Sequence, residues 1–297
     1  MQGVRIKINS ERLSMDFKKY FEKTRKEIDT ALDKNLPKGK DMLSKAMRYS
    51  VFAGGKRLRP ILVIATAQML SAKKGEAILP ACAIELVHNF TLIHDDLPCM
   101  DNDDYRRGRL ALHRAYNEAV AVLTGDALLN FAFAILVKRN VMLSPSIRIR
   151  LIQELSNALG TEGLVAGQMK EMSFRGKELN LSTIEDIYMK KTAALISGAV
   201  RIGAIIGRAN KKELSLLTNY GKNIGLAFQL TDDILEFIHG EIGIKEDEPN
   251  YVLSSNLEKA KDIVKEKIEF AKKSLHYFGR KAGILLKIAD YVINRDS

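Results

Sequence analysis

Tryptophan is absent from this 297-residue sequence, and cysteine, proline and glycine are scarce, with two, six and 20 residues. So little proline and glycine excludes a fibrous or disordered chain. Neither Cys82 nor Cys99 belongs to a C-x-x-C pair, so neither a disulfide framework nor a zinc site is indicated. We therefore expect a globular protein of the reducing cytoplasm.

Long hydrophobic runs are also lacking. The longest mainly apolar stretches, residues 127–137 and 193–200, fall short of the roughly 20 residues that a membrane span needs. Residues 1–17 carry charges without an apolar run, which does not fit a signal peptide. The sequence thus predicts no membrane span.

Positive charge is abundant, with a formal net charge of +11. A basic balance attracts polyanions, which include nucleic acid, anionic membranes and phosphorylated small molecules. The basic clusters at residues 54–60 and 105–109 lie close to acidic motifs, whereas the charges of residues 259–273 are typical of a solvated helix face. No nucleic-acid motif and no aromatic–basic interleaving is present, so we expect no nucleic-acid partner.

Helical periodicity dominates the chain, and no convincing strand alternation is present. No linker divides the sequence, so we expect one all-α domain over residues 1–297, with residues 1–14 outside its ordered part. Helices that are apolar nearly all round, such as 192–207, are typical of the inside of a large bundle. The predicted helical segments are 16–34, 41–53, 60–71, 77–97, 115–139, 146–172, 183–208, 211–238 and 256–274.

The first acidic motif, DDLPCMD, lies at the end of the segment 77–97. Pro98 stops that helix, because the residue before a proline is pushed out of helical geometry. Asp95 and Asp96 are expected on the last turn, and Asp101 returns from the following loop. Three carboxylates so close together repel one another unless cations neutralise them. Magnesium is the expected cation, because it joins one or two carboxylates to substrate phosphates.

The second acidic motif, DDILE, lies on a helix that includes residues 221–237. Asp232 and Glu236 are four residues apart and share one helix face, with Gln229 one turn earlier. Either motif alone is weak, because an Asp-Asp pair at a helix end is more often a solvated terminus. Together, the two acidic clusters suggest a site with metals bound from both sides.

The stretch GGKRLRP, residues 54–60, combines flexible backbone with three cations. It suits a diphosphate, because arginine makes bidentate contacts and lysine supplies a compact charge. His88 lies seven residues before Asp95 and therefore on the same helix face. A single helical histidine is usually a packed core residue, but this one shares a face with the expected metal ligands.

A second basic pair, Arg106 and Arg107, directly follows the first acidic motif. It is close enough to contact a metal-bound diphosphate. Alternatively, the neighbouring Asp103 and Asp104 pair with these arginines, and the sequence leaves both arrangements open.

Three motifs, GGKRLRP, ELVHNFTLIHDDLPCMDNDDYRRG and AFQLTDDILE, occur in this order and resemble those of the trans-isoprenyl diphosphate (polyprenyl) synthases. The resemblance runs from about residue 42 to 257. The four-residue gap between Asp96 and Asp101 resembles the bacterial farnesyl and type II geranylgeranyl branches. The family resemblance implies a transferase that condenses isopentenyl diphosphate with an allylic diphosphate. It also implies a bundle of long helices around a deep central cavity, as a homodimer.

The resemblance also implies roles for individual residues. It assigns isopentenyl diphosphate to Gly55, Lys56, Arg59 and His88, with Arg107 assisting. It assigns the allylic diphosphate or its metals to Arg106, Lys191, Thr192 and Gln229. Magnesium, three ions per active site, would be held mainly by Asp95, Asp101 and Asp232, with Asp96, Asp233 and Glu236 in support. The expected catalytic set is Asp95, Asp96, Asp101, Arg106, Lys191 and Asp232.

Product length is expected to depend on Phe90 and Thr91, just before the first acidic motif. Phe90 is five residues before Asp95, so its ring is expected roughly 7 Å deeper at 1.5 Å per residue. An aromatic floor favours the fifteen-carbon product in the family. The stretch PCMDNDD looks more like geranylgeranyl synthases, so twenty carbons stays open, as does an ordinary core role for Phe90.

Some residues depart from the family pattern. Glu236 stands where aspartate is usual, and so does Glu171. The loop 240–251 is short, with Lys245 and Tyr251 as the plausible counterparts of the usual basic and tyrosine residues. These changes leave open a non-catalytic subunit of a heteromeric synthase. A class I terpene cyclase is a second rival, because such enzymes also use acidic clusters. GGKRLRP favours an enzyme with a second diphosphate pocket, which a cyclase does not need.

Overall fold

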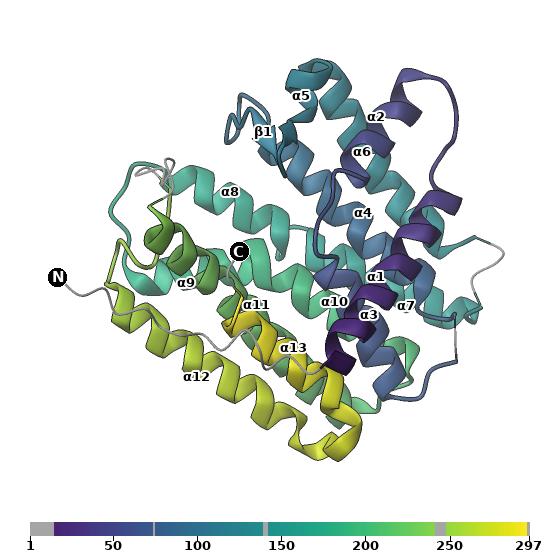
Figure 1. Cartoon of the computed structure of the whole chain (residues 1–297), viewed down its shortest axis with the longest axis vertical. Helices are drawn as coiled ribbons and strands as arrows, with labels where there is room; N and C mark the ends of the chain where they lie inside the picture. Colours follow the sequence, from purple (N-terminus) through teal and green to yellow (C-terminus); the bar gives the residue numbers. More distant parts are fainter. Residues whose placement is uncertain (1–14, 74, 139–141, 241–247, 296–297) are drawn as a thin grey trace. The chain divides into compact units, whose positions relative to one another are not determined.

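The computed structural model describes residues 15–73, 75–138, 142–240 and 248–295 (Figure 1). The expectations for residues 1–14 and for Lys245 lie outside these residues. The chain divides into two compact units, so the prediction of one domain stays a prediction. The α4 unit comprises Glu22–Asn157 and Ala199–Lys211, and the α11 unit comprises Met1–Phe21, Ala158–Gly198 and Lys212–Ser297.

The α4 unit is built around α4, a helix that is buried over most of its length. Thirteen of the 18 residues of α4 are buried, and α2, α3 and α6 pack against it. A helix that is apolar on nearly every side needs such neighbours. The helices of this unit are α1 (Met15–Asn35), α2 (Met42–Val51), α3 (Leu58–Met69), α4 (Ile78–Asp95), α5 (Leu112–Ala115), α6 (Glu118–Leu136) and α7 (Pro145–Leu159).

The end of α4 has the expected position. The helix ends at Asp95, and Asp96 caps it by donating its backbone N–H to the Leu92 carbonyl oxygen at 3.1 Å. Pro98 follows, and it cannot continue a helix. This stop fixes the first acidic motif at the junction of a buried helix and a loop.

Helix α6 is shorter than the predicted segment 115–139 and largely apolar over its whole length. Among the described residues it is the one helix that could cross a membrane by length and composition, with a mean hydropathy of 1.9. The apolar stretch 127–137 of the sequence covers only the second half of α6 and its C-cap. Because α6 packs against α2 and α4, and a core helix of a soluble protein passes the same test, this is weak evidence for a span.

A short hairpin follows the first acidic motif, and the helical periodicity did not predict it. Its strands pair antiparallel with Arg106 opposite Arg109. The turn residues Arg107 and Gly108 have φ angles of 54° and 74°. Positive φ at both positions is the type I′ geometry of two-residue hairpin loops. The strands are β1 (Tyr105–Arg106) and β2 (Arg109–Leu110).

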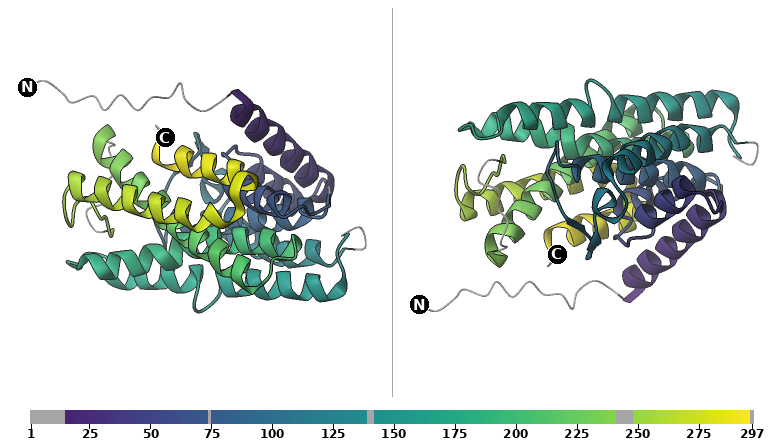
Figure 2. Two further views of the ribbon diagram at one scale, coloured as in Figure 1. Left: turned by 90° about the horizontal axis from the view of Figure 1, so that it is seen from below. Right: turned by 90° about the horizontal axis from the view of Figure 1, so that it is seen from above.

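The α11 unit is organised by its 29-residue helix. A Cβ at Gly221 would lie 2.7 Å from Ser197 Cα, and one at Gly225 would lie 2.4 Å from Ala193 Cα. These glycines therefore allow close packing of α11 against residues 193–197. Helices α12 and α13 lie side by side in this unit (Figure 2). Its main elements are α8 (Leu164–Phe174), α9 (Leu181–Tyr188), the π-helix η2 (Met189–Ala193), α11 (Lys211–His239), α12 (Leu257–Leu275), η3 (His276–Ala282) and α13 (Gly283–Ile293). Helix α10 (Ala194–Ile206) is divided, because its residues from Ala199 onward belong to the α4 unit, and Met15–Phe21 of α1 belongs to the α11 unit.

Three of the predicted helical segments differ from the structure. The segment 146–172 is broken between α7 and α8, where two glycines, Gly160 and Gly163, interrupt the helix. The segment 183–208 contains the π-helix η2, which periodicity does not distinguish from an α-helix. The segment 115–139 begins late, because Asn117 caps α6 through its side chain.

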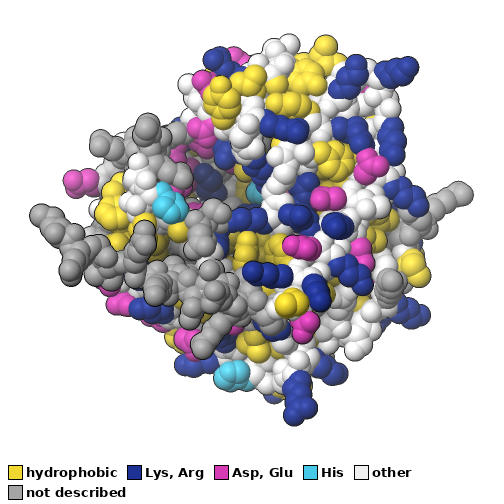
Figure 3. Space-filling view, viewed as in Figure 1, with side chains coloured by type: hydrophobic (Ala, Val, Ile, Leu, Met, Phe, Trp, Pro, Cys, Tyr) yellow, Lys and Arg dark blue, Asp and Glu magenta, His cyan; other side chains and the backbone are white. Residues whose placement is uncertain are grey.

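Helix α13 was not predicted, although its buried residues Leu285, Ile288, Ala289 and Val292 follow helical spacing. The non-helical Gly279 in front of it separates this short pattern from α12. The charged side chains of residues 259–273 lie at exposed or half-buried positions of α12, as expected for a solvated helix face. On the face shown in Figure 3, Lys and Arg side chains over α1 are interspersed with Asp and Glu.

Candidate active site

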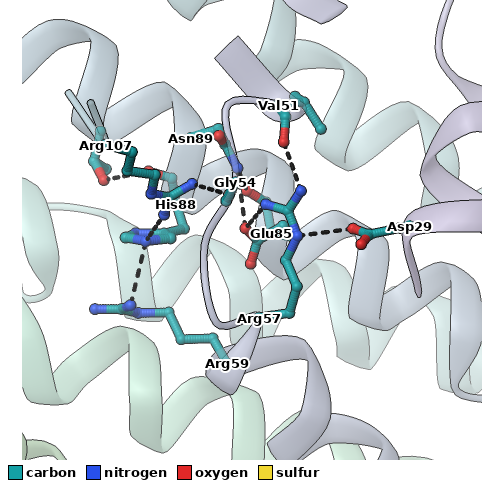
Figure 4. A network of polar contacts seen from close by, with 10 residues as sticks. Asp29, Val51, Gly54, Arg57, Arg59, Glu85, His88, Asn89 and Arg107 are labelled. Atoms are coloured by element: carbon teal, nitrogen blue, oxygen red, sulfur yellow. Dashed lines mark hydrogen bonds and ion pairs between the residues drawn. The ribbon is translucent and has the colours of Figure 1, made fainter. Parts of the chain in front are cut away.

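Two arginines converge on one histidine in the α4 unit (Figure 4). Arg59 Nη1 lies 3.4 Å from His88 Nε2, and Arg107 Nη2 lies 3.3 Å from the same nitrogen. Arg107 Nη1 also donates to the Gly54 carbonyl oxygen at 2.6 Å. A Cβ at Gly55 would lie 2.7 Å from Arg107 Cζ, so a side chain there would displace this arginine. The structure thus brings together four of the five residues predicted to bind isopentenyl diphosphate.

The convergence has an electrostatic consequence. Desolvation and the charges of Arg59 and Arg107 hold the pKa of His88 well below its usual range. The imidazole is therefore neutral at physiological pH, and because guanidinium groups only donate, its Nε2 accepts. Lys56, the fifth predicted residue, is half-buried in the loop before α3. Cations held this close repel one another, and a bound anion would relieve that repulsion.

The first acidic motif folds back as predicted. The Asp101 backbone N–H donates to the Asp95 carbonyl oxygen at 2.8 Å, which returns the loop to the helix end. Asp96 has a different environment, because it is 2% exposed and accepts hydrogen bonds from Arg106. Burial raises the pKa of Asp96, and the bond from Arg106 opposes that rise.

The arginine–aspartate alternative is correct in part. Arg106 Nε lies 2.8 Å from Asp96 Oδ1, and its Nη2 lies 2.9 Å from Asp103 Oδ2. Asp104 instead pairs with Arg114 at 2.8 Å. Arg106 therefore neutralises one carboxylate of the first motif and is held beside the motif from its hairpin.

In the α11 unit, the second acidic motif places its two aspartates differently. Asp233 is 2% exposed and accepts hydrogen bonds from the Tyr188 hydroxyl at 2.6 Å, the Tyr251 N–H at 2.8 Å and Gln229 Nε2 at 3.3 Å. Burial raises the pKa of Asp233 to about 7, although these three donors oppose the rise. Asp233 therefore belongs to the interior, whereas Glu236 on the same helix is exposed.

Asp232 has an arginine partner that the sequence did not suggest. Arg295 Nη2 lies 2.6 Å from Asp232 Oδ1 and 2.7 Å from the Phe228 carbonyl oxygen. The guanidinium also stacks on the Phe228 ring, with Cζ 3.8 Å from the centroid. Little in the sequence indicated this contact, because Arg295 lies far from Asp232 in the chain and outside every motif.

The π-helix η2 presents the predicted allylic residues. Thr192 Oγ1 donates to Gln229 Oε1 at 2.7 Å, and Lys191 Nζ pairs with Glu171 at 2.5 Å. A Cβ at Gly167 would lie 2.2 Å from the Lys191 backbone nitrogen, so α8 packs directly on η2. π-Helical turns occur frequently at functional sites.

Gln168, which the sequence analysis did not single out as a site residue, lies in the same unit. It is 8% exposed, and neither its Nε2 nor its Oε1 has a hydrogen-bond partner in the described structure. A buried amide without partners is costly unless a ligand or water completes its hydrogen bonds. This orphaned amide therefore marks a place where the α11 unit can accept a polar ligand.

Comparisons with known proteins match this arrangement. The profile of the family described as polyprenyl synthetase matches residues 40–247. The chain is 38% identical to a farnesyl diphosphate synthase of Geobacillus stearothermophilus over 95% of this chain and 99% of that protein. It is 41% identical to a chloroplastic geranylgeranyl pyrophosphate synthase of Capsicum annuum over 95% of this chain and 79% of that protein. A crystal structure of an FPP/GFPP synthase from Zymomonas mobilis superposes with a TM-score of 0.86 at 38% identity, covering 94% of this chain and 99% of that one.

The chain belongs to the polyprenyl synthetase family. The family and the all-α fold expected from the motifs are confirmed. The family match includes both acidic motifs and the basic loop, and it ends at residue 247 within the short loop.

Magnesium, the metal expected for this synthetase, fits the first acidic motif in a limited sense. No three His, Cys, Asp or Glu side chains within the described ranges lie close enough to hold a metal ion by themselves. Magnesium, however, uses one or two carboxylates and completes its shell with water and substrate phosphates. The Asp95–Asp101 turn, beside the basic Arg106, is a donor set of that kind.

The predicted chain-length residues lie on α4. Phe90 is 8% exposed, and its ring meets the His94 ring edge-on at a centroid distance of 4.8 Å. The Thr91 hydroxyl donates to the His88 carbonyl oxygen of its own helix at 2.8 Å. Phe90 is the single phenylalanine of α4 and lies among buried residues of this helix.

Proposed function

We propose that this synthetase joins isopentenyl diphosphate head to tail to an allylic diphosphate, with dimethylallyl or geranyl diphosphate as the primer. The observation that carries the proposal is the convergence of Arg59 and Arg107 on His88, in the same unit as the Asp95–Asp101 turn. An anion site and a magnesium-type carboxylate pair are the two elements that a diphosphate transferase needs.

In the α4 unit, Lys56, Arg59 and Arg107 bind the diphosphate of isopentenyl diphosphate. Arginine suits this task because its planar fork makes two parallel hydrogen bonds to phosphate oxygens. Neutral His88 completes the site without adding a third repelling charge beside the two guanidiniums. Gly55 keeps Arg107 in place by leaving room for it.

The allylic diphosphate is bound through magnesium. Asp95, Asp101 and Asp232 would be its main ligands, with Asp96, Asp233 and Glu236 in support. When bound, magnesium ions, three in this proposal, stabilise the charge that builds on the departing pyrophosphate. Arg106 and Lys191 add positive charge to the same group, while Thr192, Gln229 and Gln168 supply polar contacts.

The chain then has three tasks in catalysis. It binds both diphosphates in line, it keeps water from the allylic cation with apolar side chains such as Phe90, and it positions the isopentenyl double bond for attack. A new carbon–carbon bond forms, the allylic carbon–oxygen bond breaks, and the proton lost from the isopentenyl unit passes to the pyrophosphate. No nucleophilic side chain is required.

The finer properties follow from the same residues. The Phe90 ring favours the fifteen-carbon product, farnesyl diphosphate, over the twenty-carbon one. We propose a cytoplasmic homodimer without a membrane span, with α6 as a core helix. The two cysteines are free, with Cys82 buried and Cys99 exposed.

The test is incubation of the purified chain with isopentenyl diphosphate and each allylic primer in turn, with magnesium or with a chelator. Chromatography of the products should show elongation only with magnesium, ending mainly at fifteen carbons. Cyclic hydrocarbons made from a single allylic diphosphate would instead indicate a terpene cyclase. No product from the chain alone, but product after addition of a second subunit, would indicate a non-catalytic partner.

A further inference from the structure

Arg57 is the middle one of the three cations in GGKRLRP, and its role differs from that of Lys56 and Arg59. Arg57 lies between Lys56 and Arg59, yet its side chain is 2% exposed. Figure 4 shows that the guanidinium groups of Arg57 and Arg59 point in different directions, and that of Arg59 lies beside His88. Arg57 therefore is turned into the protein rather than toward the anion site.

Each nitrogen of the buried guanidinium has an acceptor on a different element. Arg57 Nε donates to Asp29 of α1 at 2.9 Å, and Nη1 donates to Glu85 of α4 at 2.7 Å. Nη2 donates to the carbonyl oxygen of Val51, the last residue of α2, at 2.6 Å. These bonds use three of the five guanidinium N–H groups, and the side chain is too deeply buried for Arg57 to bind the diphosphate itself.

The backbone of Arg57 is held in an uncommon conformation. It is the N-cap of α3 and has φ 54° and ψ 31°, in the left-handed region. A residue other than glycine persists there only when its surroundings determine its position. The three contacts of the side chain supply that restraint. The direction in which the nearby Lys56 and Arg59 side chains point depends on the backbone conformation of this turn.

Glu85 connects the restraint to the anion site. It is 1% exposed, and its Oε1 accepts from Arg57 and from Asn89 Nδ2 at 3.2 Å. Glu85 lies one turn before His88 on α4. The Arg57–Glu85 ion pair thus joins the loop that carries Arg59 to the helix turn that carries His88. Desolvation disfavours the charged guanidinium, but the charges of Glu85 and Asp29 outweigh it and raise the pKa of Arg57.

We propose that Arg57, through Glu85 and Asp29, is a positioning residue that sets the distance between the basic loop and His88 and so determines the affinity for isopentenyl diphosphate. The inference rests on the proposed function of this site. A buried ion pair alone is weak evidence for stabilisation, because desolvation offsets much of its attraction. What distinguishes this pair is that it joins the two elements whose side chains converge on the anion.

The test compares Arg57→Lys with the wild-type chain. Lysine keeps the charge that compensates Glu85, but its single ammonium cannot reproduce the three-way fork. We expect Arg57→Lys to weaken isopentenyl diphosphate binding about tenfold or more in calorimetry, with a matching rise in its KM. The KM for geranyl diphosphate should change by less than about twofold, because that substrate is held by other residues.

A matched control is available in the same unit. Arg208 also has a positive φ, 61°, and pairs with a buried glutamate, Glu76, at 3.0 Å. It belongs to no predicted site, so Arg208→Lys should lower the Tm at most and leave isopentenyl diphosphate affinity unchanged. If Arg57→Lys does not fold, Asp29→Asn removes only the most exposed of the three partners and should weaken the same affinity in the same direction.

Three results separate the possible failures. If Arg57→Lys and Asp29→Asn bind isopentenyl diphosphate as tightly as the wild-type chain, Arg57 has no positioning role. Equal loss of affinity for both substrates would contradict it as well, because general destabilisation affects both. Absence of any elongation by the wild-type chain would instead contradict the proposed function itself.

Discussion

The Tyr188 hydroxyl donates a 2.6 Å hydrogen bond to Asp233, and the same hydroxyl lies 2.9 Å from the Pro249 carbonyl oxygen. Burial and the negative charge of Asp233 raise the pKa of Tyr188 well above its usual value, so the phenol keeps its proton. One tyrosine thereby joins α9, the second acidic motif and the last part of the loop 240–251. Asp233 thus anchors the turn of α11 that carries Asp232 to the protein interior.

Removing this hydroxyl should destabilise the protein. In Tyr188→Phe the buried Asp233 carboxyl loses its shortest hydrogen bond, and an under-satisfied buried group costs about 1–3 kcal/mol. Tyr49→Phe is the control, because the Tyr49 hydroxyl donates to Leu110 at 2.9 Å in an exposed position and should cost less than about 0.5 kcal/mol. Denaturant unfolding without substrate measures both, and equal stabilities would show that the Tyr188 bond contributes nothing.

His88 should give the stability a characteristic dependence on pH. Its pKa is depressed in the folded state, so the unfolded chain binds a proton more readily below about pH 6.5. Stability is therefore fully present above that pH and falls as the pH drops toward the folded pKa, by up to about 1.4 kcal/mol per pH unit. His88→Gln cannot take up this proton, and its stability should fall less steeply from pH 6.5 to 5 in the absence of diphosphates. Parallel curves for the two proteins would show that His88 is not desolvated as described.

Much of the site could be predicted because its residues lie in short motifs. Pro98, within the first acidic motif, indicated where α4 ends, and the seven-residue spacing placed His88 on the face of Asp95. The hairpin of residues 105–110 was missed because an Arg-Gly turn lacks the usual Asn-Gly signal. Its geometry nevertheless decides which aspartates Arg106 contacts.

Other features depend on contacts between distant parts of the sequence. Nothing in the spacing of GGKRLRP distinguishes Arg57, which is buried, from Arg59, which is half-buried beside His88. That difference arises from Asp29 and Glu85, each 28 residues away. Arg295 is a similar case, since it contacts Asp232 across 63 residues. Sequence spacing alone does not reveal such partners.

Gly125 of α6 should be sensitive to substitution. A Cβ there would lie 2.1 Å from His94 Nε2, because the His94 ring lies against this glycine with Nε2 3.2 Å from the Val122 carbonyl oxygen. Gly125→Ala must displace His94, which directly precedes Asp95. We expect a loss of about 1–3 kcal/mol of stability from overpacking and a lower kcat at saturating substrate.

The control for this substitution is Gly283→Ala, where an added Cβ meets no atom within 4 Å. It should change stability by less than about 1 kcal/mol and leave kcat unaltered. If Gly125→Ala behaves in the same way, the close contact between α4 and α6 is not required.

Phe90 should determine product length. Phe90→Ala removes the ring that stacks edge-on with His94, and the growing chain should then extend beyond fifteen carbons. Leu86→Ala is the matched core variant, because Leu86 is fully buried on the same helix. It should lower stability by about 2–5 kcal/mol without changing the product. Chromatography of the products decides, and an unchanged product in Phe90→Ala would return Phe90 to an ordinary core role.

The central proposal is that the magnesium-dependent reaction requires a carboxylate from each of the two acidic motifs. The most direct measurement is the initial rate of pyrophosphate release from geranyl and isopentenyl diphosphates, titrated with magnesium, for the wild-type chain, Asp95→Asn and Asp232→Asn. We expect each variant to lose at least about 100-fold in rate at saturating magnesium, as for removal of a major transition-state contact. A rate near that of the wild-type chain in either variant would contradict the account.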